Sequence, residues 1–175
     1  MRSTLKMALV PAALALTLLA SASAWAQTNI SAGYQFAHVS VNGSGEIYPA
    51  GWYVDGSVGV LPMMALALQI GGIYKSVNGV TLHADEFLGG ARLAVKAVPA
   101  VTPFVQALIG EVSAGASGSS NSAFSIQLGG GVDIKSISIF RLRLGADYRR
   151  NFFSAAHGGA DNVFAGMLGV VLGGR

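Results

Sequence analysis

The segment 140–150, FRLRLGADYRR, places charged residues at alternate positions of an otherwise mostly apolar stretch. Arg141, Arg143 and Arg149 share one parity with Asp147. Guanidinium and carboxylate groups gathered on one side can form ion pairs or line a path for ions. In a helix, at about 100° per residue, Arg141 and Arg143 would lie on nearly opposite faces, whereas a strand places them on the same face. The spacing therefore predicts a strand with one charged face.

Other alternating segments carry charges on their polar face as well. Four acidic and four basic residues are predicted to share one side of the resulting sheet. They are Asp55, Glu86, Arg92, Asp133, Arg141, Arg143, Asp147 and Arg149. Such a set can serve as a narrow ion path, or it can form a structural network in which each buried charge has a partner.

The three histidines raise the possibility of acid–base chemistry. His38, His83 and His157 fall at strand ends beside loops, His83 lies close to Asp85 in sequence, and His157 precedes Asp161. They lie on separate loops, without metal-ligand spacing and without a nucleophile motif, so the geometry that a catalytic site demands is not indicated. Solvated loop histidines are the favoured interpretation, and no catalytic, cofactor-binding or metal-binding residue is predicted.

The N-terminal residues have the layout of a secretory signal peptide. Arg2 and Lys6 precede an apolar run, and small residues end the segment at Ala24 and Ala26. We expect cleavage after Ala26, which leaves a single domain over 27–175. Two of the 11 basic residues lie in the leader, so the mature chain has 9 basic and 8 acidic residues and a net charge of +1. No basic run with interleaved aromatic residues is present, so nucleic acid is not an expected partner.

The composition is unusual for an exported soluble domain. Only 11% of residues are charged and 52% are hydrophobic, and cysteine is absent. After residue 26, no apolar run is long enough for a membrane-spanning helix. An apolar, exported chain of this kind is typical of a closed barrel in an outer membrane, where the backbone groups are satisfied between strands.

Alternation predicts eight strands, and in two of them the parity stays undecided. The predicted strands are 29–39, 51–61, 65–75, 86–96, 103–113, 123–135, 140–150 and 162–173. The undecided strands are 103–113 and 162–173, which are apolar on both faces. Connectors rich in Gly, Ser and Asn at 42–50, 76–79, 113–121 and 152–161 are predicted to be mostly long surface loops. Those at 61–64, 97–102 and 135–136 are predicted to be short turns at the opposite end.

The sparse charges decide which face points inward. A soluble barrel would turn its apolar face inward, but the eight charges named above and Lys75 are too few to cover a wall that faces water. We therefore expect paired charges inside and lipid outside. Seven aromatic residues near the long connectors would form an interfacial girdle, with Phe140 and Phe104 at the opposite rim. The seven are Phe36, Trp52, Tyr74, Phe87, Phe124, Tyr148 and Phe164.

Two segments also resemble a known family. The run 128–150, LGGGVDIKSISIFRLRLGADYRR, and the run 102–110, TPFVQALIG, look like strands of small bacterial outer-membrane β-barrel proteins of the opacity-protein and outer-membrane-protein-A-like superfamily. The resemblance implies an all-β, eight-stranded, antiparallel up-and-down transmembrane β-barrel that is inserted by the outer-membrane insertion machinery. Such barrels commonly end in an aromatic residue, whereas this sequence ends in VVLGGR.

The expected protein is therefore a non-enzymatic barrel in outer-membrane lipid, with a filled, charge-paired interior and four surface loops. An eight-stranded interior is just wide enough for side chains to fill, which favours the structural interpretation of the charges. Envelope integrity or surface interaction is the expected role, with no ligand identified. The alternatives are a narrow pore for small solutes and, less favoured, an envelope enzyme that uses rim His and Asp residues.

Overall fold

The computed structural model describes residues 28–41, 44–95, 100–116, 119–137, 140–154 and 159–173, and the regular structure in these ranges is all strand. The strands are β1 (Thr28–Val41), β2 (Ser44–Tyr48), β3 (Ala50–Leu61), β4 (Met64–Val77), β5 (Val80–Ala94), β6 (Val101–Ala116), β7 (Ser119–Ile137), β8 (Phe140–Phe152) and β9 (Ala160–Gly173). No helix in the described ranges has the length and apolarity needed to cross a bilayer. The predicted leader, 1–26, lies outside the described residues.

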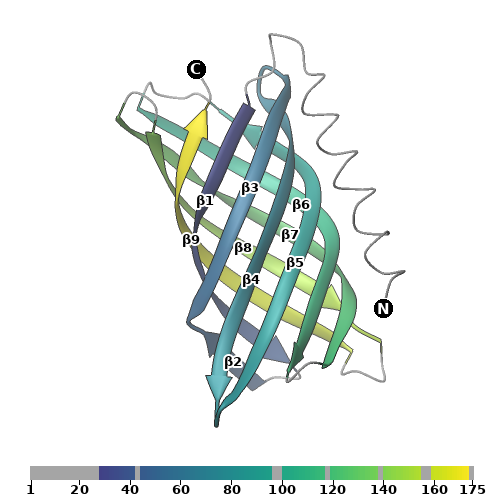
Figure 1. Ribbon diagram of the computed structural model, residues 1–175. Coiled ribbons are helices and arrows are strands. Elements are labelled where there is room, and N and C mark those ends of the chain that lie inside the picture. Colours follow the sequence, from purple (N-terminus) through teal and green to yellow (C-terminus); the bar gives the residue numbers. More distant parts are fainter. Residues whose placement is uncertain are drawn as a thin grey trace, which may run out of the picture.

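The strands form one closed antiparallel barrel in chain order (Figure 1). From β3 onward each strand pairs with the next, and β9 closes the sheet on β1, from Asn29 opposite Gly173 to Val41 opposite Asp161. Both β2 and β3 pair with β1, and only Pro49 separates them. Proline cannot donate to a ladder, so the two act as one strand interrupted at that residue. The predicted eight-stranded up-and-down barrel is confirmed.

The predicted long connectors are largely wrong, because the strands continue into them. Residues 44–48 form β2, and the predicted loop 113–121 contributes Ala116 and Ser119 as a register pair between β6 and β7. Short polar residues fit the ladder there because its hydrogen bonds use the backbone alone. The connector at 76–79 is a tight turn in which Asn78 and Gly79 have φ of 51° and 81°. Positive φ at both central positions matches the right-handed twist of a two-residue hairpin.

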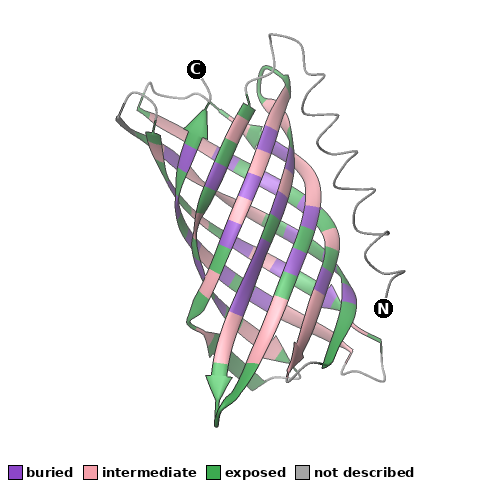
Figure 2. Cartoon of the chain, in the orientation of Figure 1, coloured by how far each residue is buried: buried purple, intermediate pink, exposed green. Residues whose placement is uncertain are grey.

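Buried and more exposed residues alternate along the strands (Figure 2), as expected where successive side chains point to the interior and to the outer wall. The alternation resolves both strands whose parity the sequence left undecided. In β6, Gln106, Leu108 and Val112 point inward, and in β9, Val163 and Val171 do so. These inward residues are all less than 5% exposed, whereas the outward Val105 and Ile109 are more than half exposed.

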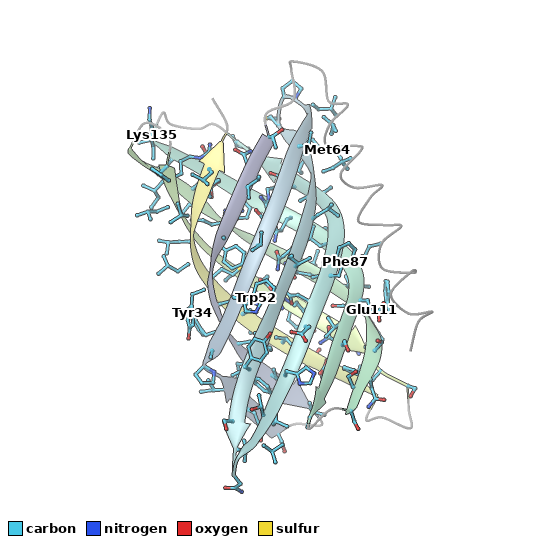
Figure 3. The ribbon with its side chains drawn as sticks, viewed as in Figure 1. Tyr34, Trp52, Met64, Phe87, Glu111 and Lys135 are labelled. Atoms are coloured by element: carbon cyan, nitrogen blue, oxygen red, sulfur yellow. The ribbon has the colours of Figure 1, made fainter. Side chains whose placement is uncertain are left out.

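The outer wall is predominantly apolar and carries aromatic rings toward the end with β2 and the β4–β5 turn (Figure 3). Trp52 donates to the Tyr74 hydroxyl at 3.2 Å, and the rings of Tyr148 and Phe164 lie 4.9 Å apart. Glu111 also points outward, in register with Phe87 and Phe124 on its two neighbours. Arg150 is exposed on the same wall and lies over the ring of Phe152.

Two glycines let one large ring fit inside the barrel. Tyr53 is 1% exposed, and it lies beside Gly33 on β1, which in turn pairs with Gly169 on β9. A Cβ atom on Gly169 would stand 2.2 Å from the Tyr53 hydroxyl and 2.6 Å from the Ala32 carbonyl oxygen. Both approaches are far inside van der Waals contact, so the position requires glycine.

Candidate functional site: a charged interior below a rim cavity

The first charged cluster comprises Asp55, Arg92, Asp133 and Arg143, contributed by β3, β5, β7 and β8. Arg143 holds Asp133 with two parallel bonds, Nε to Oδ1 at 2.7 Å and Nη2 to Oδ2 at 2.9 Å. Its remaining nitrogen reaches Asp55 Oδ1 at 2.8 Å, and Arg92 pairs with the same aspartate. All four side chains are at most 9% exposed. One carboxylate thus bridges two guanidiniums in the core of the barrel.

The second charged cluster comprises Glu86, Asp147 and Arg149. Arg149 Nε lies 2.7 Å from Asp147 Oδ1, and Arg149 also pairs with Glu86. A third contact, from Arg149 Nη2 to Gln35 Oε1 at 2.9 Å, uses another of its donors. Because these donors are directed at three different acceptors, the guanidinium is fixed in place across β1, β5 and β8.

Neutral amides join the two clusters. Gln69 Nε2 donates to Glu86 Oε1 at 2.9 Å, and Gln106 accepts from Arg92 Nε at 3.0 Å. Gln106 and Gln127 each donate to Gln69 Oε1 at 3.4 Å. The polar core is therefore one continuous network that spans the barrel cross-section. Strand parity was the available sequence signal for Gln69 and Gln127, whereas Gln106 lies on the segment 103–113, whose parity the sequence left undecided.

Arg141 is not part of either cluster, although the sequence analysis grouped it with them. It donates to the Asn29 side chain and, at 2.8 Å, to the Gly173 carbonyl oxygen, at the barrel end where β1 begins and β9 ends. The described interior therefore holds its charges in two clusters, with Arg141 apart from both at the barrel end. The two clusters hold four carboxylates and three guanidiniums.

Phe104 also differs from expectation, because it lies inside the barrel and not on the outer rim. It is 4% exposed, and the guanidinium carbons of Arg92 and Arg143 lie 4.9 Å and 4.7 Å from its ring centroid. The electron-rich face of an aromatic ring attracts cations, so Phe104 adds a favourable contact to both guanidiniums of the first cluster. The two apolar faces of the segment 103–113 gave no signal for this role.

A cavity of about 350 Å³ opens above the second cluster, toward the barrel end that carries the β4–β5 turn. We call it the rim cavity. Glu86 and Arg149 line its inner end. Its apolar walls include Val39, Ile73, Leu82, Ala84, Val112 and Val163.

Asn151 and Asp161, register partners on β8 and β9, also line the rim cavity. Each keeps one buried side-chain oxygen, Oδ1, that has no hydrogen-bond partner among the described residues. Asp161 precedes Phe164 by three residues and so lies nearer the end of the barrel than the aromatic part of the outer wall. Burial raises the pKa of its carboxyl. The described part of the chain provides no basic partner for Asp161 in any ion pair.

The histidines do not form a reactive centre in the described structure. His83 lines the rim cavity, His38 lies beside Gly45, and His157 lies outside the described residues. Within the described ranges, no group of three or more His, Cys, Asp or Glu residues could hold a metal ion. The described residues of this arrangement can bind polar and apolar groups, and among them no activated nucleophile lies next to a base.

The sequence matches no model of a known protein family and no curated protein sequence. Solved structures match over most of the chain. Ail, the attachment invasion locus protein of Yersinia pestis, solved with the heparin analogue sucrose octasulfate, is 17% identical with a TM-score of 0.60. That match covers 85% of this chain and 99% of Ail. Neisserial surface protein A is also 17% identical, with a TM-score of 0.62 over 83% of this chain and 96% of that one.

A major outer membrane protein from Thermus thermophilus matches at 13% identity, with a TM-score of 0.52 over 86% of this chain and all of that one. The chain has the fold of the small outer-membrane β-barrels. At these identities the likeness concerns the fold, and the family resemblance seen in the sequence is confirmed at that level.

Proposed function

We propose that this protein is a non-enzymatic outer-membrane barrel, held in lipid by its outer wall and closed by its charged interior. One observation carries the proposal: the barrel is inverted relative to a soluble one. Ion-paired arginines and carboxylates occupy its core, while leucine, isoleucine, valine and phenylalanine side chains cover its surface. Water would solvate such a surface poorly, whereas hydrocarbon solvates it well.

Closure of the hydrogen-bonded ladder also supports a hydrocarbon environment around the barrel. Hydrocarbon offers no partner to a free backbone N–H or C=O, so only helices or edgeless sheets cross it. Pairing of β9 with β1 closes the sheet, and among the described strands only the short β2, at one end of the barrel, keeps an unpaired edge. The aromatic residues on the outer wall supply the amphipathic rings that favour a membrane–water interface.

The interior supports a structural role over a conducting one. Charged side chains and their glutamine partners cross-link strands around the barrel, and each charge in the two clusters has an opposite partner. An eight-stranded barrel leaves little volume beyond such side chains. Stabilisation of the envelope, or interaction through the exposed strand ends and turns, is the role that fits a closed barrel without an activated nucleophile.

Export of the full chain in a Gram-negative host tests the proposal. We expect the mature protein to begin at Gln27 and to sediment with the outer membrane. In gel electrophoresis with detergent, an unheated sample should migrate faster than a boiled one. A known outer-membrane barrel and a periplasmic protein, followed in the same fractions, provide the controls. Recovery in the soluble periplasm, or an intact residue 1 in the mature protein, would contradict it.

A further inference from the structure

We propose that the rim cavity is a binding site for a small organic cation, with an ammonium group at Asp161 and Asn151 and an apolar body against the barrel wall. The first observation is its volume of about 350 Å³, which lies near the lower end of the range for small-molecule sites. A single ring or a short alkyl chain would occupy much of it. The site extends the protein's role beyond that of a closed structural barrel.

The chemistry of the walls selects the body of the ligand. Valine, isoleucine, leucine and alanine side chains from β1, β4, β5, β6 and β9 face the cavity. Ile73 and Val163 belong to a buried apolar cluster with Ala37 and Ala165, so this wall is packed and fixed before a ligand arrives. An apolar ligand surface would replace water along these side chains.

The unpaired acceptors select the head group. Asn151 is 4% exposed, and its Oδ1 atom has no donor among the described residues. On the neighbouring strand, the Oδ1 atom of Asp161 is also buried and has no donor among the described residues. Buried acceptors without donors are costly, and an ammonium group offers three donors together with a positive charge.

The charge balance of the cavity favours a cation over a neutral donor. Glu86 and Arg149 at the inner end are paired to each other, and Arg149 is further engaged by Asp147. Asp161 is left as the carboxylate without a basic partner in the described part of the cavity. The negative charge of Asp161 would repel a ligand carboxylate, and a neutral alcohol would not neutralise that charge.

Three probes of matched size test the proposal: phenethylammonium, 2-phenylethanol and phenylacetate. Each is titrated at neutral pH into the full mature chain in phosphatidylcholine nanodiscs, with empty nanodiscs subtracted. Phosphatidylcholine has no primary amine that could compete. We expect saturable binding of phenethylammonium, at least about tenfold tighter than 2-phenylethanol, with no binding of phenylacetate. Equal affinity for the three probes, or preference for phenylacetate, would overturn the proposal.

Variants then locate the binding. Asp161→Asn keeps the shape and should abolish the preference for the cation, whereas the matched control Asp85→Asn, an exposed carboxylate on β5, should keep it. Ala84→Leu should weaken all ammonium binding by filling the cavity. Unchanged phenethylammonium affinity in Asp161→Asn or in Ala84→Leu would refute the site.

Heat-shifted mobility shows which variants are folded, and Ala114→Leu, another cavity-lining change, substitutes for one that is not. The probe series on the unaltered chain decides the ligand class without any variant. Failure of binding leaves the outer-membrane fractionation unaffected, so the two proposals fail separately.

Discussion

At the scale of single residues, the interior depends on how many partners each charge has. Arg143 forms ion pairs with both Asp133 and Asp55, and Asp55 forms a second ion pair with Arg92. Loss of Arg143 therefore leaves Asp133 as the carboxylate without a basic partner in the described interior. This difference makes the two aspartates unequal in their response to substitution.

Arg143→Leu should destabilise the barrel by about 3–5 kcal/mol, because a buried charge loses its partner. Adding Asp133→Asn should recover part of this loss, whereas adding Asp55→Asn should recover less, because Arg92 would then also lose its carboxylate. Arg143→Lys should be milder than Arg143→Leu, since it keeps the charge and loses the paired bonds to Asp133. Urea refolding titrations in lipid vesicles measure all four variants. Equal recovery by both double variants would contradict the assigned pairing.

Leu144, the next residue, points to the outer wall, so there the reverse change, from leucine to arginine, should destabilise the barrel. Leu144→Arg places a charge where we propose hydrocarbon, at a cost of roughly 2–4 kcal/mol at the bilayer midplane and less near an interface. The same titration measures it, with Leu144→Met as the control of similar volume. A neutral Leu144→Arg in a folded barrel would mean that this position does not contact lipid.

Residue parity was readable from the sequence, but the partners of each residue were not. The alternation over 140–150 correctly places Arg143 and Arg149 inside, because strand geometry alone sets the face. Pairing depends on how strands stagger around a closed barrel, which no single segment encodes. This is why Arg141 is found at a barrel end, bonded to Asn29, and why the cavity acceptor Asn151 was overlooked.

At the scale of the strands, close contact between β1 and β9 depends on glycine. Gly169→Ala should cost about 1–3 kcal/mol, because its Cβ would overlap the Ala32 carbonyl oxygen and the Tyr53 hydroxyl. Gly56→Ala is the matched control on β3, where an added Cβ meets no atom within 4 Å. The control should stay within about 0.5 kcal/mol of the parent. Equal effects of the two changes on vesicle refolding would refute the close approach.

Strand number was predictable from the sequence, but strand length was not. Six alternating segments and two that are apolar on both faces indicated the count, whereas the Gly-, Ser- and Asn-rich connectors 42–50 and 113–121 were interpreted as loops. In the structure, residues 44–48, 113–116 and 119–121 extend the ladder beyond the apolar band. Composition indicates loop where side chains are small and polar, but strand pairing needs only backbone groups and a neighbour in register.

At the scale of the whole molecule, the filled interior should block ion flow. Planar bilayers that contain the purified barrel should show at most rare, small conductance steps, because arginine, carboxylate and glutamine side chains cross-link the lumen. A porin reconstituted in parallel is the positive control. Steady porin-like conductance would favour the narrow pore that the sequence left as an alternative.

The seam between β1 and β9 also governs when the protein can fold. Asn29 of β1 pairs with Gly173 of β9, so the ladder cannot close until the last described strand is present. Before closure, the growing sheet has two edges whose N–H and C=O groups lack partners, which makes early insertion into hydrocarbon unfavourable. Bringing such distant segments together carries the entropy of a very long loop. In the outer-membrane location that we propose, the chain from Asn29 to Gly173 must therefore be present and unaggregated before the ladder can close.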